Sequence, residues 1–171
     1  MHTRISSQEQ CPYIYVHIYD IFTDLPGRNL NGSTIPAYIT PTTSKPDMVI
    51  HDKDKDIVYI IELTVPLEPN ICKARERKEA KYTQLVSDIR TNHQCHLICL
   101  EVGSRGIITK DNKKQLRRIM KIVKEPKTKV FNNTISRLAL VGSFVIFWAK
   151  DEPIWSNMSL LKKIILSILM H

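Results

Sequence analysis

The sequence predicts an α/β domain in which helices flank a mixed β-sheet, and three observations favour this class. The 171 residues are 43% hydrophobic and 25% charged, the balance of a globular domain and not of a fibrous or low-complexity chain. Strand-like and helix-like segments follow one another along the middle of the chain. Two apolar runs are separated only by the charged turn DKDKD at 52–56, which is typical of a β-hairpin.

The first half of the chain predicts three strands. Residues 12–22 (PYIYVHIYDIF) are rich in aromatic and β-branched residues and favour a strand. Residues 25–46 hold repeated Pro and Gly and indicate a loop, with room for a short strand at 35–40. The hairpin then comprises 47–51 and 57–65.

The second half predicts a helix, a strand and further helical segments. Asn70 is expected to cap a helix over 71–91, and a strand over 93–102 ends at Gly103. A basic helix follows over 110–123. The apolar run 135–150 fits either a helix or a strand, and 160–170 predicts a terminal helix.

These elements divide the chain into three parts. Residues 1–11 give no clear element, and residues 12–130 form the predicted α/β core. Residues 131–171 are expected to be an apolar, helical extension that packs on this core. No internal repeat is present in the sequence.

Two carboxylates stand in unusual places. Asp47 opens the first hairpin strand, and Glu62 lies inside an otherwise apolar one. With the turn centred between residues 54 and 55, facing residues sum to 109, so Asp47 and Glu62 become neighbours with Cβ atoms roughly 5 Å apart. Like charges so close favour a cation between them, and Mg²⁺ prefers such hard oxygen ligands. The structural alternatives are a turn cap for Asp47 and a salt bridge for Glu62.

The following helix carries lysines on its apolar face. When residues 71–89 are projected as a helix, Lys78 and Lys81 lie in the middle of that face. A lysine on a core-facing stripe is costly without a partner, so either amine is expected to reach toward Asp47 and Glu62. Two acids, a cation and a lysine suffice for metal-assisted phosphodiester hydrolysis. The alternative is that the lysines extend to solvent.

Several segments of the sequence together resemble a known family. KPDMVI (45–50), IELTVPLE (61–68), ARERKEAKY (74–82) and EVGSRG (101–106) resemble the PD-(D/E)xK nucleases. The similarity is closest to the restriction-endonuclease-like domain of site-specific retrotransposons without long terminal repeats, and to reverse-transcriptase-associated relatives. Together with DLPGRNLNGSTIP (24–36) and SRLALVGSF (136–144), it spans roughly residues 20–155.

This resemblance implies a fold, a reaction and a set of site residues. The implied fold is the three-layer restriction-endonuclease-like type, and the implied reaction is nicking of DNA with Mg²⁺ (or Mn²⁺). Asp47, Glu62 and the Leu63 carbonyl would hold the metal. Thr64 stands where the motif has a strand lysine, so Lys78 or Lys81 would take the catalytic place, and the choice stays open.

The resemblance also implies partners, and one departure from it defines the alternative function. DNA is the expected partner, beside a reverse transcriptase or another targeting domain in a longer parent protein. Only residues 1–11 precede the first predicted strand, where the family has a helix. The alternative is therefore an inactive, nucleic-acid-binding remnant of the same fold, or one that functions only in protein interactions.

Positive charge is concentrated in the second half of the chain. The whole chain carries a net charge of +8, whereas residues 1–70 hold five basic and nine acidic side chains. With the family resemblance, this excess predicts phosphate contacts by the loop and basic helix. The candidates are Arg105, Lys110, Lys113, Lys114, Arg117, Arg118 and Lys121. An ordinary solvated helix face is the alternative.

Three remaining features bear on location and metal class. Residues 1–10 have no apolar core, which argues against a secretory signal. The apolar run 138–148 is shorter than the ~20 residues that span a bilayer. We therefore expect an intracellular protein without a membrane segment, nuclear if it acts on DNA. Cys95 and Cys99 would point away from His96 on a strand, so zinc is not expected there.

Overall fold

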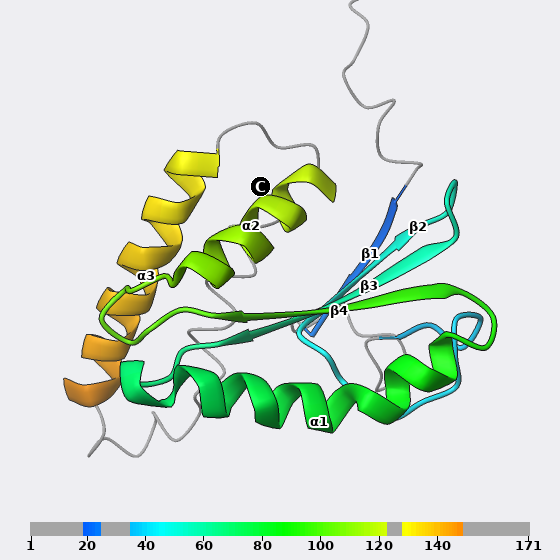
Figure 1. Ribbon diagram of the computed structural model, residues 1–171, viewed down its shortest axis with the longest axis horizontal. Coiled ribbons are helices and arrows are strands. Elements are labelled where there is room, and N and C mark those ends of the chain that lie inside the picture. Colours follow the sequence, from blue (N-terminus) through cyan, green and yellow to red (C-terminus); the bar gives the residue numbers. More distant parts are fainter. Residues whose placement is uncertain (1–18, 25–34, 123–127, 149–171) are drawn as a thin grey trace, which may run out of the picture.

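The computed structural model of the chain describes residues 19–24, 35–122 and 128–148 (Figure 1). Over these residues the protein is an α/β structure with a four-stranded mixed sheet and three α-helices, as predicted for the general class. The expectations for residues 1–18 and for the terminal helix at 160–170 lie outside the described residues.

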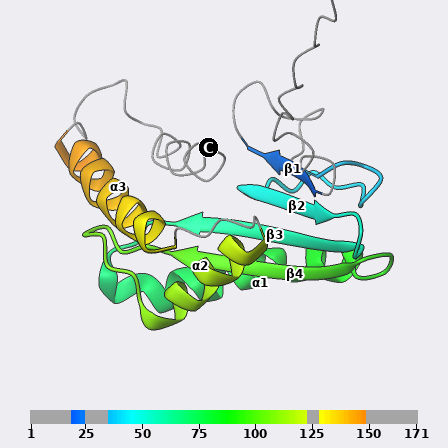
Figure 2. The same cartoon turned by 90° about the horizontal axis from the view of Figure 1, so that it is seen from above.

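The sheet has the order β1-β2-β3-β4, with β1 and β4 at its two edges (Figure 2). Its strands are β1 (Tyr19–Thr23), β2 (Met48–Asp52), β3 (Ile57–Thr64) and β4 (Gln94–Glu101). The first two pairings are antiparallel, and β3 pairs with β4 in parallel. The suggested strand at 35–40 is a turn instead, because the Ile39 and Thr40 N–H groups both donate to the Pro36 carbonyl.

The hairpin of β2 and β3 has the predicted register. Met48 faces Ile61 and Asp52 faces Ile57, so facing residues sum to 109. The turn ends at Asp56, whose φ of 55° lies in the left-handed region that Asp tolerates better than most residues. This register brings Asp47, one residue before β2, to the level of Glu62.

Helix α1 (Ile71–Ile89) connects the parallel strands β3 and β4. It follows the 3₁₀ turn η2 (Glu68–Asn70) without a break. Asn70 was expected to cap it, but its side chain makes no capping hydrogen bond with a described residue. The reason is its backbone: ψ is 5°, whereas a capping residue needs the extended conformation.

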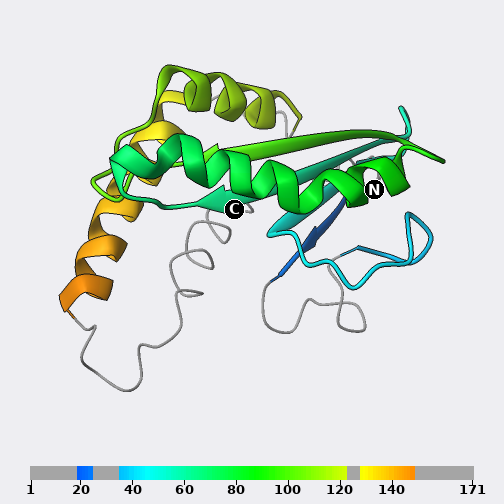
Figure 3. The same ribbon diagram turned by 60° about the horizontal axis from the view of Figure 1, so that its bottom comes forward.

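The helices form a layer on each face of the sheet. Helix α1 runs along one face, whereas α2 (Lys110–Ile122) and α3 (Thr128–Trp148) cover the other (Figure 1, Figure 3). Alternation along β3 divides its side chains between the two: Val58, Ile60 and Glu62 face α1, whereas Ile61 and Leu63 face α2 and α3. Glu62 is thus the polar member of an apolar stripe.

Two apolar cores fill these layers. The core under α1 includes Val49, Ile60, Tyr82, Leu85 and Ile89. The core under α2 and α3 includes Ile50, Ile61, Leu100, Leu116, Ile119, Ile135 and Ala139. Each fully buried aliphatic side chain contributes about 1.5–3 kcal/mol to folding. The sheet is therefore fixed from both sides around the two acids.

The ambiguous apolar segment after residue 134 is helical. It belongs to α3, which begins at Thr128, before the boundary expected at 131. Within α3, residues 129–147 form one stretch long and apolar enough to cross a membrane by length and composition, with a mean hydropathy of 1.4. Ile135 and Ala139 from this stretch are fully buried in the core of the domain, whereas Phe144 is exposed. The expected absence of a membrane segment stays a prediction.

Candidate active site

Asp47 and Glu62 meet across the hairpin through reciprocal hydrogen bonds. The Asp47 N–H donates to Glu62 Oε1 at 3.2 Å, and the Leu63 N–H donates to Asp47 Oδ2 at 2.8 Å. Both side chains are buried, with Asp47 5% and Glu62 1% exposed. The predicted neighbourhood of the two acids is present in the structure.

Lys78 joins the two acids from the helix above. Its amine donates to Glu62 Oε2 at 2.5 Å, and the lysine side chain is only 13% exposed. The lysine is therefore directed inward and does not extend to solvent. The Lys78 amine therefore supplies a polar partner for a carboxylate that is otherwise enclosed by apolar side chains.

Lys81 lies one contact further from the acids. Its amine donates to the Tyr82 hydroxyl at 2.7 Å, and this hydroxyl donates to the Lys45 carbonyl at 3.2 Å. Burial, together with the nearby Glu62 and Asp47 carboxylates, raises the pKa of Tyr82. The phenol therefore stays neutral and separates Lys81 from Glu62.

The donor atoms at this place suit a hard divalent cation. The carboxylates of Asp47, just before β2, and of Glu62, in β3, lie close together there, and the Leu63 N–H contacts Asp47. Carboxylate and carbonyl oxygens are the ligands that Mg²⁺ and Mn²⁺ prefer. The Asp47 and Glu62 carboxylates therefore supply oxygen donors of this class, and the Leu63 carbonyl as a further ligand stays a prediction.

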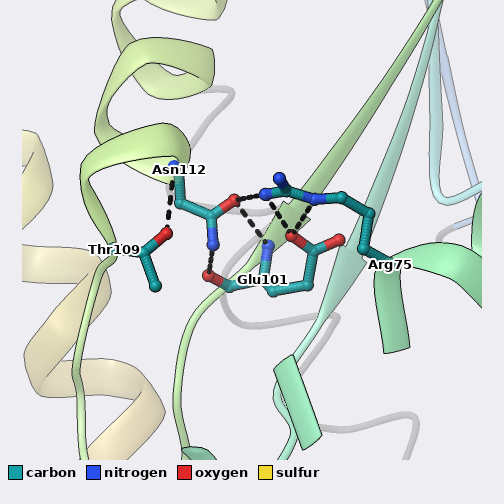
Figure 4. Close-up of polar contacts among 4 residues, drawn as sticks. All are labelled: Arg75, Glu101, Thr109 and Asn112. Carbon is teal, nitrogen blue, oxygen red and sulfur yellow. Dashed lines mark hydrogen bonds and ion pairs between the residues drawn. The ribbon is translucent and has the colours of Figure 1, made fainter. Parts of the chain in front are cut away.

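A second ion pair, which no sequence motif predicted, joins a buried acid to a partly exposed arginine of α1. Arg75 donates to Glu101 Oε2 from Nε at 2.9 Å and from Nη2 at 2.7 Å, and Nη2 also donates to Asn112 Oδ1 at 2.5 Å (Figure 4). Asn112 in turn donates to the Glu101 carbonyl at 2.5 Å. This network ties α1, β4 and the first turn of α2 together.

A sequence signal for this network was present. Glu101 ends a strand that is apolar over its last residues, as Glu62 interrupts another, and Arg75 lies three residues before Lys78, on the same side of the helix. The pairing of an acid in the strand with a base on the helix therefore occurs twice. Between Arg75 and Lys78, only Lys78 contacts the predicted metal ligands among the described residues.

The predicted phosphate-binding residues lie in two places, on α2 and on the loop after β4. Those on α2 are all exposed: Lys110, Lys113, Lys114, Arg117, Arg118 and Lys121. They belong to the layer opposite α1, so the sheet lies between most of this basic face and the acid pair. Lys114 also lies 3.5 Å from Asp111.

Arg105, on the loop after β4, has an acidic partner. Its backbone N–H and its guanidinium Nε both donate to Glu68, each at 2.9 Å. These bonds lower the pKa of Glu68. Gly103 completes the contact, because a Cβ there would lie 2.6 Å from Glu68 Oε1. Glu68 and Arg105 thus connect the motifs ELTVPLE and EVGSRG.

The residues considered for zinc on β4 lie as expected on opposite faces. Cys95 and Cys99 are buried, whereas His96 stacks on Tyr59 with ring centroids 5.6 Å apart. Burial raises the pKa of Cys95 to about 11 and of Cys99 to about 12. Both thiols are therefore protonated and are poor metal ligands.

Another group of potential metal ligands lies at the far end of the hairpin. His51, Asp56 and His93 have ligand atoms within 4.8 Å of one another. No sequence motif indicates this group, because His93 lies 37 residues beyond Asp56 and only the fold brings it near the hairpin.

Comparison of the chain with protein-family models, with curated proteins and with solved structures found no match.

Proposed function

We propose that this protein is a metal-dependent DNA endonuclease of the PD-(D/E)xK type that nicks its substrate. The observation that carries the proposal is the convergence of Asp47, Glu62 and Lys78 at one place beneath α1. Three charged groups buried together cost folding free energy, so their retention favours a chemical role.

The order of the elements supports the restriction-endonuclease-like fold as part of this proposal. An antiparallel hairpin carries the two acids, and the helix after it carries the lysine and leads into a parallel strand. This is the arrangement that the sequence motifs imply. Helices on both faces of the sheet give the three layers.

In the proposed reaction the protein residues would hold the metal ion and stabilise the phosphate, and the ion would activate the attacking water. Asp47, Glu62 and the Leu63 carbonyl would bind Mg²⁺ or Mn²⁺. When bound, such an ion polarises the phosphoryl group and lowers the pKa of a coordinated water. The positive charge of Lys78 would stabilise the negative charge that develops on the phosphate.

The contacts favour Lys78 over Lys81 as the functional lysine. Lys78 contacts Glu62 directly, whereas Lys81 contacts the neutral phenol of Tyr82. In this proposal Tyr82 and Lys81 are positioning residues, because the Tyr82 hydroxyl also anchors the Lys45 backbone just before Asp47. Lys81 would steady that hydroxyl and not touch the reacting phosphate.

The second candidate function is nucleic-acid binding without cleavage. It is favoured by the exposed basic face of α2, whose side chains can contact phosphates without a metal ion. Phosphate contacts by such a face would be independent of sequence and would weaken with salt. The two functions differ in one respect: only the first requires Asp47 and Glu62.

The test is nicking of supercoiled plasmid DNA by the purified full chain in Mg²⁺ or Mn²⁺. We expect nicking that chelation abolishes, and that Asp47→Asn or Glu62→Gln reduces by at least about 100-fold while DNA binding persists. Glu79→Gln, which removes an exposed acid from α1, is the matched control and keeps its activity. Tight DNA binding without any nicking would replace the enzyme with the binding module.

A further inference from the structure

The His51–Asp56–His93 cluster lies away from the acid pair. Asp47 precedes β2, whereas His51 is near the end of β2, Asp56 follows in the hairpin turn and His93 immediately precedes β4. The two sites therefore occupy opposite ends of the hairpin. Because the cluster shares no residue with the acid pair, a ligand bound there would be independent of the proposed nuclease function.

One ligand atom from each of the three residues lies within 4.8 Å of the other two. Asp56 Oδ1 lies 3.5 Å from His51 Nε2 and 2.6 Å from His93 Nδ1. The imidazole rings of His51 and His93 meet edge to face, with centroids 5.5 Å apart. Neighbouring ligands of a tetrahedral zinc ion are about 3.3–3.5 Å apart for bonds of about 2.0–2.2 Å. The first distance matches this spacing, and the second requires His93 to move away by less than about 1 Å.

His51 provides an independent indication that a ligand belongs here. It is only 7% exposed, and neither of its ring nitrogens has a hydrogen-bond partner within the part of the chain that the structure describes. A buried polar group without a partner lowers the stability of the folded state, so such groups are rare in folded proteins. The nitrogen nearest Asp56 faces the other two ligands, where an ion would satisfy it.

Neighbouring residues hold the cluster in position. The Tyr38 ring packs against the His51 ring with centroids 5.9 Å apart, and the Tyr38 hydroxyl donates to Asp20. The Gln94 N–H donates to the Asp56 carbonyl at 3.2 Å, which fixes the turn against the start of β4. Asp56 remains exposed, so an ion can enter from solvent on that side.

The donor set indicates the class of metal. Two imidazoles and one carboxylate are typical of zinc and of other late divalent transition metals, whereas Mg²⁺ prefers oxygen ligands alone. Three protein ligands leave one position of a tetrahedron for water. We propose that His51, Asp56 and His93 form a site for Zn²⁺ or a similar late transition metal, at the end of the hairpin opposite Asp47 and Glu62.

Binding there would join three segments that are distant in sequence. The ion would link β2, the hairpin turn and the connection between α1 and β4, and so constrain the register of the hairpin that carries Asp47 and Glu62. The hydrogen bond between His93 and Asp56 would be exchanged for bonds to the metal.

The test is calorimetric titration of the full chain with ZnCl₂, repeated with MgCl₂. We expect one Zn²⁺ per chain and no matching heat from Mg²⁺. Substitution Glu62→Gln leaves the zinc affinity unchanged, which separates this site from the acid pair. Co²⁺ in place of Zn²⁺ should give the intense visible absorption of a four-coordinate ion.

Variants in the cluster decide the proposal. His93→Gln, at a partly exposed loop position, is expected to weaken Zn²⁺ binding at least about tenfold, and His51→Gln to abolish it. His96→Gln, a histidine of β4 outside the cluster, is the control. If the full chain binds no Zn²⁺, or if His93→Gln binds it as tightly as the original chain, the proposal is wrong. The His93 variant keeps this outcome readable if His51→Gln fails to fold.

Discussion

Glu62 shows at the scale of one residue how burial and chemistry are connected. An acid in the middle of an apolar strand is tolerated here because Lys78 and the Asp47 N–H bind both of its oxygens. Removing one partner of such a pair leaves an uncompensated buried charge, which costs more than removing both. Stability and activity are therefore separable at this residue.

The cost of leaving Glu62 without its lysine partner gives a prediction for Lys78 and Lys81. Lys78→Met is expected to lower nicking at least about 100-fold and to destabilise the fold by about 3 kcal/mol, because Glu62 is left unpaired. Lys81→Met should change the nicking rate only a few-fold. Chemical denaturation and plasmid nicking measure the two effects.

A double variant separates the chemical role of Lys78 from a structural one. With Glu62→Gln beside Lys78→Met, no buried charge remains unpaired, so most of the lost stability should return while nicking stays absent. Full activity of the stable Lys78→Met chain would remove Lys78 from the proposed mechanism. If only Lys81→Met loses activity, the catalytic role proposed for Lys78 belongs to Lys81 instead.

At the scale of elements, the polar ties between α1, β4 and α2 set where each helix lies. Asn112 is fully buried in the first turn of α2 and contacts both Arg75 and the Glu101 carbonyl. Apolar packing alone would let a short helix slide along the sheet, whereas directed hydrogen bonds fix its start. Asn112 thus positions the basic helix.

We therefore predict that Asn112→Ala destabilises the protein by about 2 kcal/mol or more, because Arg75 and the Glu101 carbonyl lose a buried partner. The measurement is the free energy of unfolding in urea. Asn133→Ala, at an exposed position of α3, is the matched control and should change it by less than about 0.5 kcal/mol. Equal effects of the two substitutions would mean that the network contributes nothing to stability.

Local sequence patterns were sufficient for some elements and not for others. The hairpin, its register and the acid–lysine contact followed from alternation, turn length and helix projection, all of which act over short separations. The Arg75–Glu101 and His51–His93 contacts join residues 26 and 42 positions apart, so only the pairing of β3 with β4 creates them. Such contacts need the fold before they can be recognised.

At the scale of the whole molecule, charge is divided between the two helical layers. The basic face of α2 lies across the sheet from the acid pair, whereas α1 carries its own exposed bases, including Lys73 and Arg77. A DNA duplex that contacts α2 and also reaches Glu62 must therefore pass around the end of the sheet where α2 begins, at Lys110. The prediction from the sequence assigns binding to α2.

Two matched double variants test that assignment. Lys113→Gln with Arg117→Gln is expected to weaken DNA binding and to reduce the salt slope of log K by about 0.9 for each phosphate that is no longer neutralised. Lys73→Gln with Arg77→Gln removes the same charge at the same helical spacing on α1 and should have little effect. Fluorescence anisotropy over a range of salt concentrations measures both. The reverse result would move the DNA surface to α1.

The contact between Glu68 and the loop after β4 has a consequence for how this chain can vary. Gly103 leaves room for the Glu68 carboxylate, and Gly106, with φ of 81°, lies so close to α3 that a Cβ would be 2.5 Å from the Ser136 carbonyl oxygen. A change at Glu68 therefore alters the fit of a partner 37 residues later, at Arg105. A side chain added at Gly103 or Gly106 would therefore disturb contacts made by Glu68 or by Ser136, which lie in two other stretches of the chain.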